Sequence, residues 1–347
     1  MDSNGNMIRD LKLDNLRGLA ILFIVLGHFI SHSPFWTSVE YSFIYRFIFL
    51  FHLPLLIFVS GYLSKAMPES SIKAFKTILI PYLIFGTFWI IFLFLKDGNI
   101  NTTIFIVPAW GLWYLLCLYF WRVFLPTAAR IKYIFTISII AALLIGVLNF
   151  NSTILSISRA FCFFPLFLLG FYFKDVKDKF SINKYLATCV FFALLTVTAL
   201  FLMPMAHRVF FFKYSYHAMD MRNLLGMVVR LLILLVEMVG VILLFNMMTT
   251  KRTILTRVGK NSLPVYVLHF YFVLAIPYVI ELIGLGSIFN NLILTSVYIV
   301  VATGLVTFLL SREKVNDLTQ LLIKTVANIL IKKEPVDNDN VSNKKLV

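Results

Sequence analysis

The stretch LDNLRGLAILFIVLGHFISH, residues 13–32, decides the fold class of this chain. It carries Asp14 and Arg17 near its start and His28 near its end, with an apolar run between them. About 20 mainly apolar residues, at 1.5 Å per residue in a helix, are enough to cross the hydrocarbon core of a bilayer. No small-x-small cleavage site follows, so we expect a retained span rather than a signal peptide.

The rest of the chain repeats this pattern. Of its 347 residues 60% are hydrophobic and only 14% are charged, and the mean hydropathy is +0.90. Soluble domains carry about 25% charged residues. The sequence therefore predicts an all-α polytopic protein of the cell membrane, a bundle of about ten transmembrane helices. The candidate spans are 13–31, 43–63, 74–95, 104–125, 131–149, 156–173, 184–204, 224–248, 263–283 and 288–310.

The net charge of +15 is distributed unevenly between the gaps. Lys and Arg concentrate in alternate gaps, and short basic loops remain in the cytoplasm. Both termini are therefore predicted to be cytoplasmic, with the loop 205–223 on the outer side. Because the charges sit in short gaps rather than in a basic stripe with aromatics, a nucleic-acid partner is not expected.

The amino-acid composition does not change sharply along the chain, which favours a single membrane domain over 13–310. Residues 1–12 are predicted to be a cytoplasmic segment, and 311–347 a cytoplasmic extension. Within that extension, apolar residues at helical spacing over 313–333 predict an amphipathic helix on the inner membrane surface, followed by a polar tail.

Ionisable residues inside the spans are the best functional pointers, because they are costly in lipid and usually face a wet cavity or the bundle interior. Arg17 and His28 are eleven residues apart. That is three turns plus about 20°, so both side chains share one helix face, about 16 Å apart along the axis. A neutral His suits acceptance of a proton from a hydroxyl. The alternative is an Arg17 that extends to the interface and a His28 that only packs.

Further spans carry similar groups. The second span holds Arg46 and His52, with Pro54 expected to kink the helix just past His52. The ninth span holds His269. Arg46 is expected near the outer surface, at a depth similar to that of His28.

The sequence offers few residues or motifs for other kinds of catalytic or binding site. Arg230 and Glu237 are two turns apart in the eighth span and could form a structural pair. The three cysteines lie in apolar runs, which favours packing over a disulfide or a metal site. No Gly-rich phosphate loop and no G-x-S-x-G elbow is present.

Six segments in order resemble membrane acyltransferase family 3. They are Arg-x10-His from Arg17 to His28, FHLPLLIFVSGYL from Phe51, Lys73-x-x-Lys76 before LIPYL, GLWYLLCLYF, FCFFPLFLLGFYF after Arg159, and NSLPVYVLHF. The resemblance covers residues 9–310 and is closest to the branch with fucose 4-O-acetylase-like proteins.

The resemblance implies transfer of an acetyl group from acetyl-CoA, without a metal, to a hydroxyl of a surface glycan or a lipid-linked saccharide. It implies that His28 is the catalytic base and that Arg17 helps to position the donor. Lys73 and Lys76 stand where many relatives have Arg-x-x-Arg, so the charge is kept but the planar fork that binds phosphates is lost. Substrate-binding roles are implied for Arg46, His52, Trp113, Arg159 and His269.

Two alternatives stay open beside the acyltransferase. A carrier that exports glycans or lipids could use the same polar stripe as a pathway, and a scaffold for glycan assembly would not need His28. Within the acyltransferase hypothesis, the pantetheine arm of CoA threads inward or the acetyl group is relayed. A homo-oligomer within the lipid bilayer is compatible with the sequence.

Overall fold

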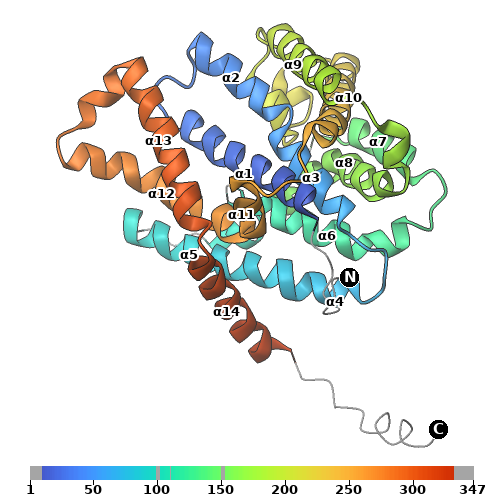
Figure 1. The fold of residues 1–347 in the computed structure, drawn as a ribbon, viewed down its shortest axis with the longest axis horizontal. Coiled ribbons are helices and arrows are strands. Elements are labelled where there is room, and N and C mark those ends of the chain that lie inside the picture. Colours follow the sequence, from blue (N-terminus) through green and yellow to red (C-terminus); the bar gives the residue numbers. More distant parts are fainter. Residues whose placement is uncertain (1–9, 99–101, 110, 150–152, 332–347) are drawn as a thin grey trace, which may run out of the picture.

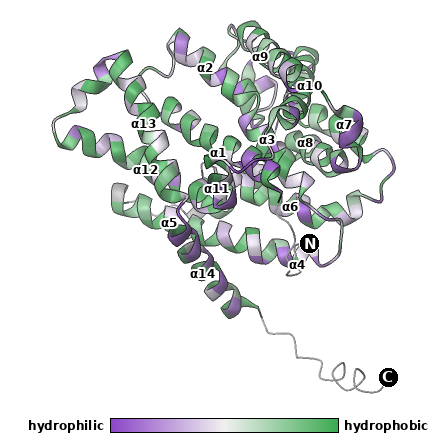
Figure 2. Ribbon diagram, viewed as in Figure 1, coloured by the Kyte–Doolittle hydropathy of each residue, from purple (hydrophilic) through white to green (hydrophobic). Residues whose placement is uncertain are grey.

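The computed structural model describes residues 10–98, 102–109, 111–149 and 153–331, and these residues form helices and no strand (Figure 1). Eight of the helical segments are long and apolar enough to cross a membrane. Figure 2 shows apolar residues over nearly all of these segments. The prediction of an all-α polytopic membrane protein is therefore confirmed. The outermost parts of the predicted termini, 1–9 and 332–347, lie outside the described residues.

The helices follow one another in a simple order, with η marking short π- or 3₁₀-helical segments. The elements are α1 (Leu11–Ser31), α2 (Val39–Phe49), α3 (His52–Tyr62), α4 (Ser70–Ala74), η1 (Phe75–Leu79), α5 (Ile80–Asp97), η2 (Thr102–Phe105), α6 (Leu112–Ala128), α7 (Ile134–Leu144), η3 (Ile154–Ser156), α8 (Ile157–Val176), η4 (Lys177–Phe180), α9 (Lys184–Phe201), η5 (His207–Phe211), η6 (His217–Met219), α10 (Asn223–Met247), α11 (Ile254–Lys260), α12 (Ser262–Leu282), η7 (Gly286–Asn290), α13 (Leu292–Leu310) and α14 (Glu313–Leu330).

Two predicted spans differ from the observed helices. The span predicted over 104–125 is α-helical only from Leu112, and α6 has 17 residues. The span predicted over 131–149 contains α7, which has 11 residues. Eleven residues rise only about 16 Å, far less than the roughly 30 Å hydrocarbon core. Tyr216 and Arg230 fill the space beside Gly146, just beyond the end of α7. The predicted count of ten spans therefore stays unconfirmed.

The second span is broken near its middle. The helix α2 ends at Phe49 and α3 begins at His52. The expected kink is present, but it lies before His52 rather than past it. The reason is that a proline ring clashes with the carbonyl four residues earlier, which for Pro54 is that of Leu50. The break places the His52 side chain next to the end of α2.

A π-helical turn interrupts the third span. The segment η1 contains Lys76 and ends two residues before Pro81. Because proline cannot donate the usual backbone hydrogen bond, the turn preceding it can widen. Lys73 on α4 and Lys76 on η1 are both exposed.

Glycines allow two pairs of helices to touch backbone to backbone. A Cβ at Gly18 would collide with a carbonyl of α11, and a Cβ at Gly259 would collide with a carbonyl of α1. Gly61 on α3 and Gly170 on α8 meet each other's helices in the same way. Small residues at such crossings are typical of membrane helices. These crossings fix α1, α3 and α8, which carry His28, His52 and Arg159 of the candidate site.

The helix α14 lies within the segment 313–333, for which an amphipathic helix was predicted. It packs against α5 and α12, with Thr319 and Ile323 buried. Lys260 of α11 pairs with Glu313 at the first turn, with 3.0 Å between Nζ and Oε1. Figure 2 shows polar and apolar residues side by side along this helix, as an amphipathic helix requires.

Candidate active site

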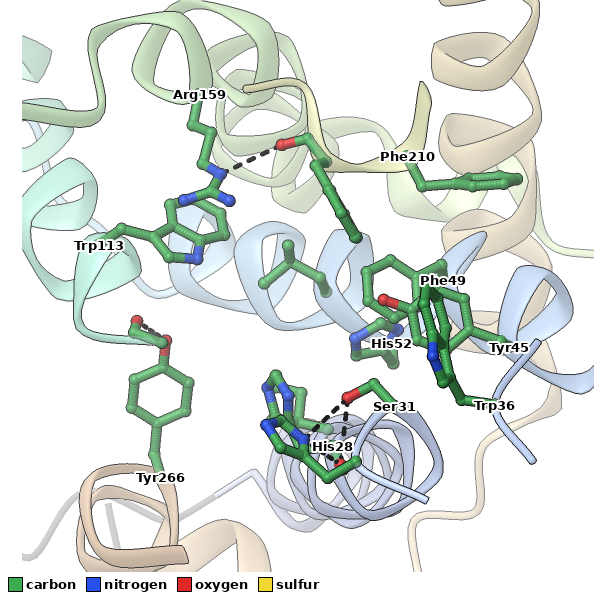
Figure 3. A pocket seen from close by; sticks show the side chains of 15 residues that line it. His28, Ser31, Trp36, Tyr45, Phe49, His52, Trp113, Arg159, Phe210 and Tyr266 are labelled. Atoms are coloured by element: carbon green, nitrogen blue, oxygen red, sulfur yellow. Dashed lines mark hydrogen bonds between the residues drawn. The ribbon is translucent and has the colours of Figure 1, made fainter. Parts of the chain in front are cut away.

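A cavity of about 380 Å³ lies between α1, α2, α3, α6, α8, α12 and the segment η5 (Figure 3). Its volume is within the range of about 300–1,000 Å³ usual for small-molecule sites. We call it the first cavity. Its lining residues are Ile24, His28, Ser31, His32, Trp36, Tyr45, Phe49, His52, Leu53, Gly111, Trp113, Arg159, Phe210, Phe211 and Tyr266.

His28 stands half-buried on the wall of the first cavity. Its ring contacts Phe270 at 4.3 Å and stacks on His269 at 5.3 Å between ring centroids. Among the described residues, no hydrogen-bond partner is present for either ring nitrogen of His28. The ring is therefore held by packing, and its nitrogens are available to a ligand in the cavity.

Three other histidines near His28 have their ring orientation fixed by main-chain carbonyls. The Nδ1 atoms of His32, His52 and His269 lie 2.8 Å, 2.7 Å and 2.9 Å from the carbonyl oxygens four residues before them. A carbonyl can only accept, so each Nδ1 carries the proton and each Nε2 keeps its lone pair. His269 is buried behind His28, and its Nε2 has no hydrogen-bond partner within the described part of the chain.

Arg159 and Trp113 lie across the cavity from His28 (Figure 3). The guanidinium of Arg159 stacks on the Trp113 ring at 4.5 Å, and its Nε donates to the carbonyl of Phe211 at 3.1 Å. The hydroxyl of Tyr266 donates to the carbonyl of Gly111. Among the described lining residues Arg159 is the one Lys or Arg, so it supplies the fixed positive charge of this cavity.

Arg46 was predicted to bind substrate, but the structure gives it a different setting. Its side chain is buried and does not line the first cavity. Its guanidinium donates to main-chain carbonyls of the α9–η5 connection, those of Leu202 at 3.2 Å, Met203 at 3.1 Å and Met205 at 2.6 Å. Its Nη1 also donates to Nε2 of His207 at 2.9 Å. Arg46 thus shapes the cavity through η5, because its donors are already used.

His207 was not selected from the sequence, yet it lies at the edge of the first cavity. Its ring contacts Trp36 at 5.2 Å and Tyr45 at 5.3 Å, two lining residues. Partial burial, and then the nearby Arg46 charge, lower the pKa of His207 to about 4. Tyr45, Tyr266 and Phe210 were missed as well, since aromatic residues are common in every span.

The predicted donor-binding residues lie away from the first cavity. Arg17 is half-buried, and its Nη1 donates to the carbonyl of Gly259 at 3.4 Å. The charge of Arg122 on α6 lies close enough to interact with Arg17. Lys73 and Lys76 are exposed and line neither this cavity nor the one described below.

A chain of ring contacts connects the two regions. From His28 it passes through His269 to Tyr266 at 6.3 Å and to Tyr114 at 5.4 Å. The Tyr114 hydroxyl is hydrogen-bonded to Ser60 at 2.7 Å and lies within electrostatic reach of Arg17. The helix face that Arg17 and His28 were predicted to share on α1 is therefore bridged by side chains of α6 and α12.

The suggested pair of Arg230 and Glu237 is not formed. Arg230 instead donates to the carbonyls of Ala142 at 3.1 Å and Tyr214 at 3.2 Å, and stacks on Tyr216 at 4.5 Å. Glu237 is buried, and its Oε2 has no hydrogen-bond partner in the described part of the chain. The arginine thus holds the connection between α9 and α10.

Within the described ranges, no group of three or more His, Cys, Asp or Glu side chains is placed to hold a metal ion. Cys117 and Cys162 are buried and Cys189 is exposed, all as free thiols.

A family model described as an acyltransferase domain matches residues 10–312. The chain is also similar to the nodulation protein NolL of Mesorhizobium japonicum, with 34% identity over 67 residues. That match covers 18% of this chain and 17% of the NolL chain, so the chain matches about a sixth of the length of this curated relative. No solved structure matches.

Proposed function

Because this chain belongs to acyltransferase family 3 and is a membrane acyltransferase, we propose that it transfers an acetyl group from acetyl-CoA. The acceptor is a hydroxyl of a cell-surface polysaccharide or of a lipid-linked glycan, and the reaction takes place in the first cavity. The membrane is the cell membrane, with the acceptor side of the cavity facing outward.

The observation that carries the proposal is the setting of His28. Its ring borders a ligand-sized cavity, and its nitrogens have no hydrogen-bond partner among the described residues. A sugar hydroxyl is a poor nucleophile until a base accepts its proton. In the proposed reaction, His28 accepts that proton while the hydroxyl oxygen attacks the thioester carbonyl. The new C–O bond forms, the C–S bond breaks, and the proton passes from His28 to the leaving thiolate.

Arg159 and His52 take supporting roles in this proposal. Negative charge develops on the carbonyl oxygen during attack, and a fixed cation in a site of low dielectric stabilises it. Arg159 is held in place by Trp113 and by the Phe211 carbonyl, so it needs no reorganisation. His52 offers its Nε2 lone pair to an acceptor hydroxyl, because its Nδ1 is bonded to the Ile48 carbonyl.

In this proposal, acetyl-CoA is bound by cations outside the first cavity. CoA carries several phosphate charges, which Lys73 and Lys76 on an exposed helical segment would bind as point charges. Arg17, with Arg122 nearby, would hold the part of the donor that reaches into the bundle. The ring-lined chain from Tyr114 to His28 is the proposed course for the reacting end of the donor.

An exporter of glycans or lipids is the alternative function. It would need a passage past the first half of α1, where Gly18 and Gly259 bring α1 and α11 into backbone contact. This tight crossing favours the acyltransferase, which needs passage only for a narrow pantetheine arm.

The test compares cells that lack the protein with cells that carry the wild type, His28→Ala or His217→Ala. Mass spectrometry of surface glycans should find an acetyl-sized mass difference with the wild type and with His217→Ala, whose side chain is exposed and lines neither cavity. His28→Ala should lower acetylation about 10²–10⁴-fold. Full acetylation by a normally expressed His28→Ala protein would defeat the catalytic assignment. Glycans absent from the surface, rather than unacetylated, would favour the exporter.

A further inference from the structure

A second cavity of about 550 Å³ adjoins the first. It lies where the end of α1 meets α12, η7 and α13. Ser31, His32 and Trp36 line both cavities. The two cavities therefore share a wall that His32 and Trp36 help to form. The lining residues of the second cavity are Phe29, Ser31, His32, Ser33, Pro34, Trp36, Val273, Pro277, Glu281, Phe289, Asn290 and Tyr298.

The polar groups of the second cavity favour a neutral ligand rich in hydroxyls. Glu281 contributes a carboxylate and Asn290 an amide, both exposed, and Ser33 and Tyr298 contribute hydroxyls. The described lining contains no Lys or Arg. A carboxylate without a neighbouring cation repels phosphate groups, so the CoA donor and phospholipid head groups are poor candidates.

Two buried hydroxyls in this cavity are unsatisfied by the protein. Oη of Tyr298 and Oγ of Ser33 are buried and have no hydrogen-bond partner among the described residues. Most buried polar atoms in folded proteins are hydrogen-bonded, and leaving one unsatisfied costs about 1–3 kcal/mol. These two atoms therefore point to a ligand that brings its own hydroxyls.

Aromatic rings complete the lining. Phe289 packs edge-on against Tyr298, with 5.3 Å between ring centroids, and Trp36 stands at the shared wall. An aromatic surface beside a carboxylate, an amide and hydroxyls suits a sugar ring. The apolar C–H face of the ring packs on the aromatics and its hydroxyls bind the polar groups.

We propose that the second cavity binds the sugar unit next to the one that is acetylated, so that the acceptor is an extended saccharide of at least two units. In this arrangement the acceptor crosses the shared wall at His32 and Trp36, with its reacting unit beside His28. Glu281 and Tyr298 then determine which neighbouring sugar is accepted. This inference rests on the proposed function.

The test uses the full-length protein in lipid nanodiscs with acetyl-CoA. The acceptors are fragments of one, two and four sugar units, prepared from the host's own surface polysaccharide after removal of its O-acetyl groups. For the wild type, KM should fall about tenfold between the one-unit and two-unit fragments, the factor expected from one added hydrogen bond to a charged group. Glu281→Gln and Tyr298→Phe should reduce this length dependence to about threefold or less.

Matched controls come from the same side of the bundle. Glu40→Gln and Tyr278→Phe change exposed residues that line neither cavity, and they should keep the wild-type length dependence. Equal KM values for one and two units in the wild type would overturn the second site. So would variants that raise KM by the same factor for every fragment length. No acetylation of any fragment by the wild type would instead overturn the proposed function, and this inference with it.

Discussion

The two halves of α1 are packed in opposite ways. In its first half, Gly18 brings the backbone against α11, and Asn15 is fully engaged. The Asn15 amide donates to the carbonyls of Thr249 and Lys251, both at 2.9 Å, and its oxygen accepts from two threonine hydroxyls. In its second half, from Ile24 onward, the helix borders two cavities.

This difference separates structure from function along a single helix. Polar groups such as Asn15 that are satisfied by the protein hold elements together, and they belong to the fold. The Tyr298 and Ser33 hydroxyls have no hydrogen-bond partner among the described residues, and together with the His28 ring they line the cavities beside the second half. Because these groups line cavities large enough for a small molecule, a ligand can satisfy them, which polar atoms enclosed in the packed interior do not allow.

The largest difference, in thermal stability, is expected between two variants that each add a methyl group, one in the first half of α1 and one in the second. In Gly18→Ala the new Cβ would collide with the Leu255 carbonyl, and backbone atoms cannot move aside cheaply. Overpacking of this kind costs about 1–3 kcal/mol. In Gly27→Ala the Cβ would meet Ile48 and Phe49 side-chain atoms at 3.8 Å, an ordinary contact. Helix propensity then favours alanine by up to about 1 kcal/mol. Thermal unfolding in detergent compares them, and equal Tm values would remove the distinction between the two halves.

A smaller effect, on the KM for acetyl-CoA, is expected from removing the exposed cations Lys73 and Lys76. The double variant Lys73→Gln/Lys76→Gln should raise KM for acetyl-CoA about tenfold, since two exposed cations contribute about 0.7 kcal/mol each to phosphate binding. The increase should shrink at high salt, which screens exposed charges. Lys177→Gln/Lys179→Gln, another exposed pair, is the matched control and should keep the wild-type KM. A tenfold increase in both double variants would show only a general charge effect.

The smallest effect is expected on the pH dependence of stability, through His207 at the edge of the first cavity. The pKa of His207 lies at about 4 in the fold, against an ordinary value of 6.5, because of burial and the Arg46 charge. Its contribution to stability is therefore complete above pH 6.5 and is lost as the pH falls toward 4. The groups that face it are Arg46, Ser42, Trp36 and Tyr45. His207→Gln should lose less Tm between pH 7 and pH 5 than the wild type. His217→Gln should behave as the wild type does, and an unchanged pH dependence in His207→Gln would contradict the assignment.

Hydropathy was enough to predict a polytopic helical bundle, and titratable groups inside it, together with the family resemblance, selected several residues that the fold brings together. His28, His52, Trp113 and Arg159 do line one cavity, although they come from four helices. The count of ten spans and the orientation of the termini stay predictions. The break before His52 was misplaced by a few residues, because the steric effect of a proline acts four residues upstream.

What could not be predicted depends on which helices face each other. Asn15 and Thr249 are 234 residues apart, and nothing in their local sequence relates them. The helix α11 was read as part of a cytoplasmic gap, since seven residues give no periodic signal. Glu281 lies near the end of α12 and Tyr298 in the first half of α13, and only the packing of α1 against these two helices places them around one cavity.

The hydrogen bonds that hold the connection between α9 and α10 have a consequence for which substitutions it tolerates. Arg46, Arg159 and Arg230 hold the connection between α9 and α10 by its main-chain carbonyls. Every amino acid presents a carbonyl, so the fastening does not depend on which side chains the loop carries. Phe210 and Phe211, which form part of the cavity wall, can therefore be exchanged while the loop keeps its course. Substitutions in this loop can therefore change the shape of the first cavity while the helices around it stay in place.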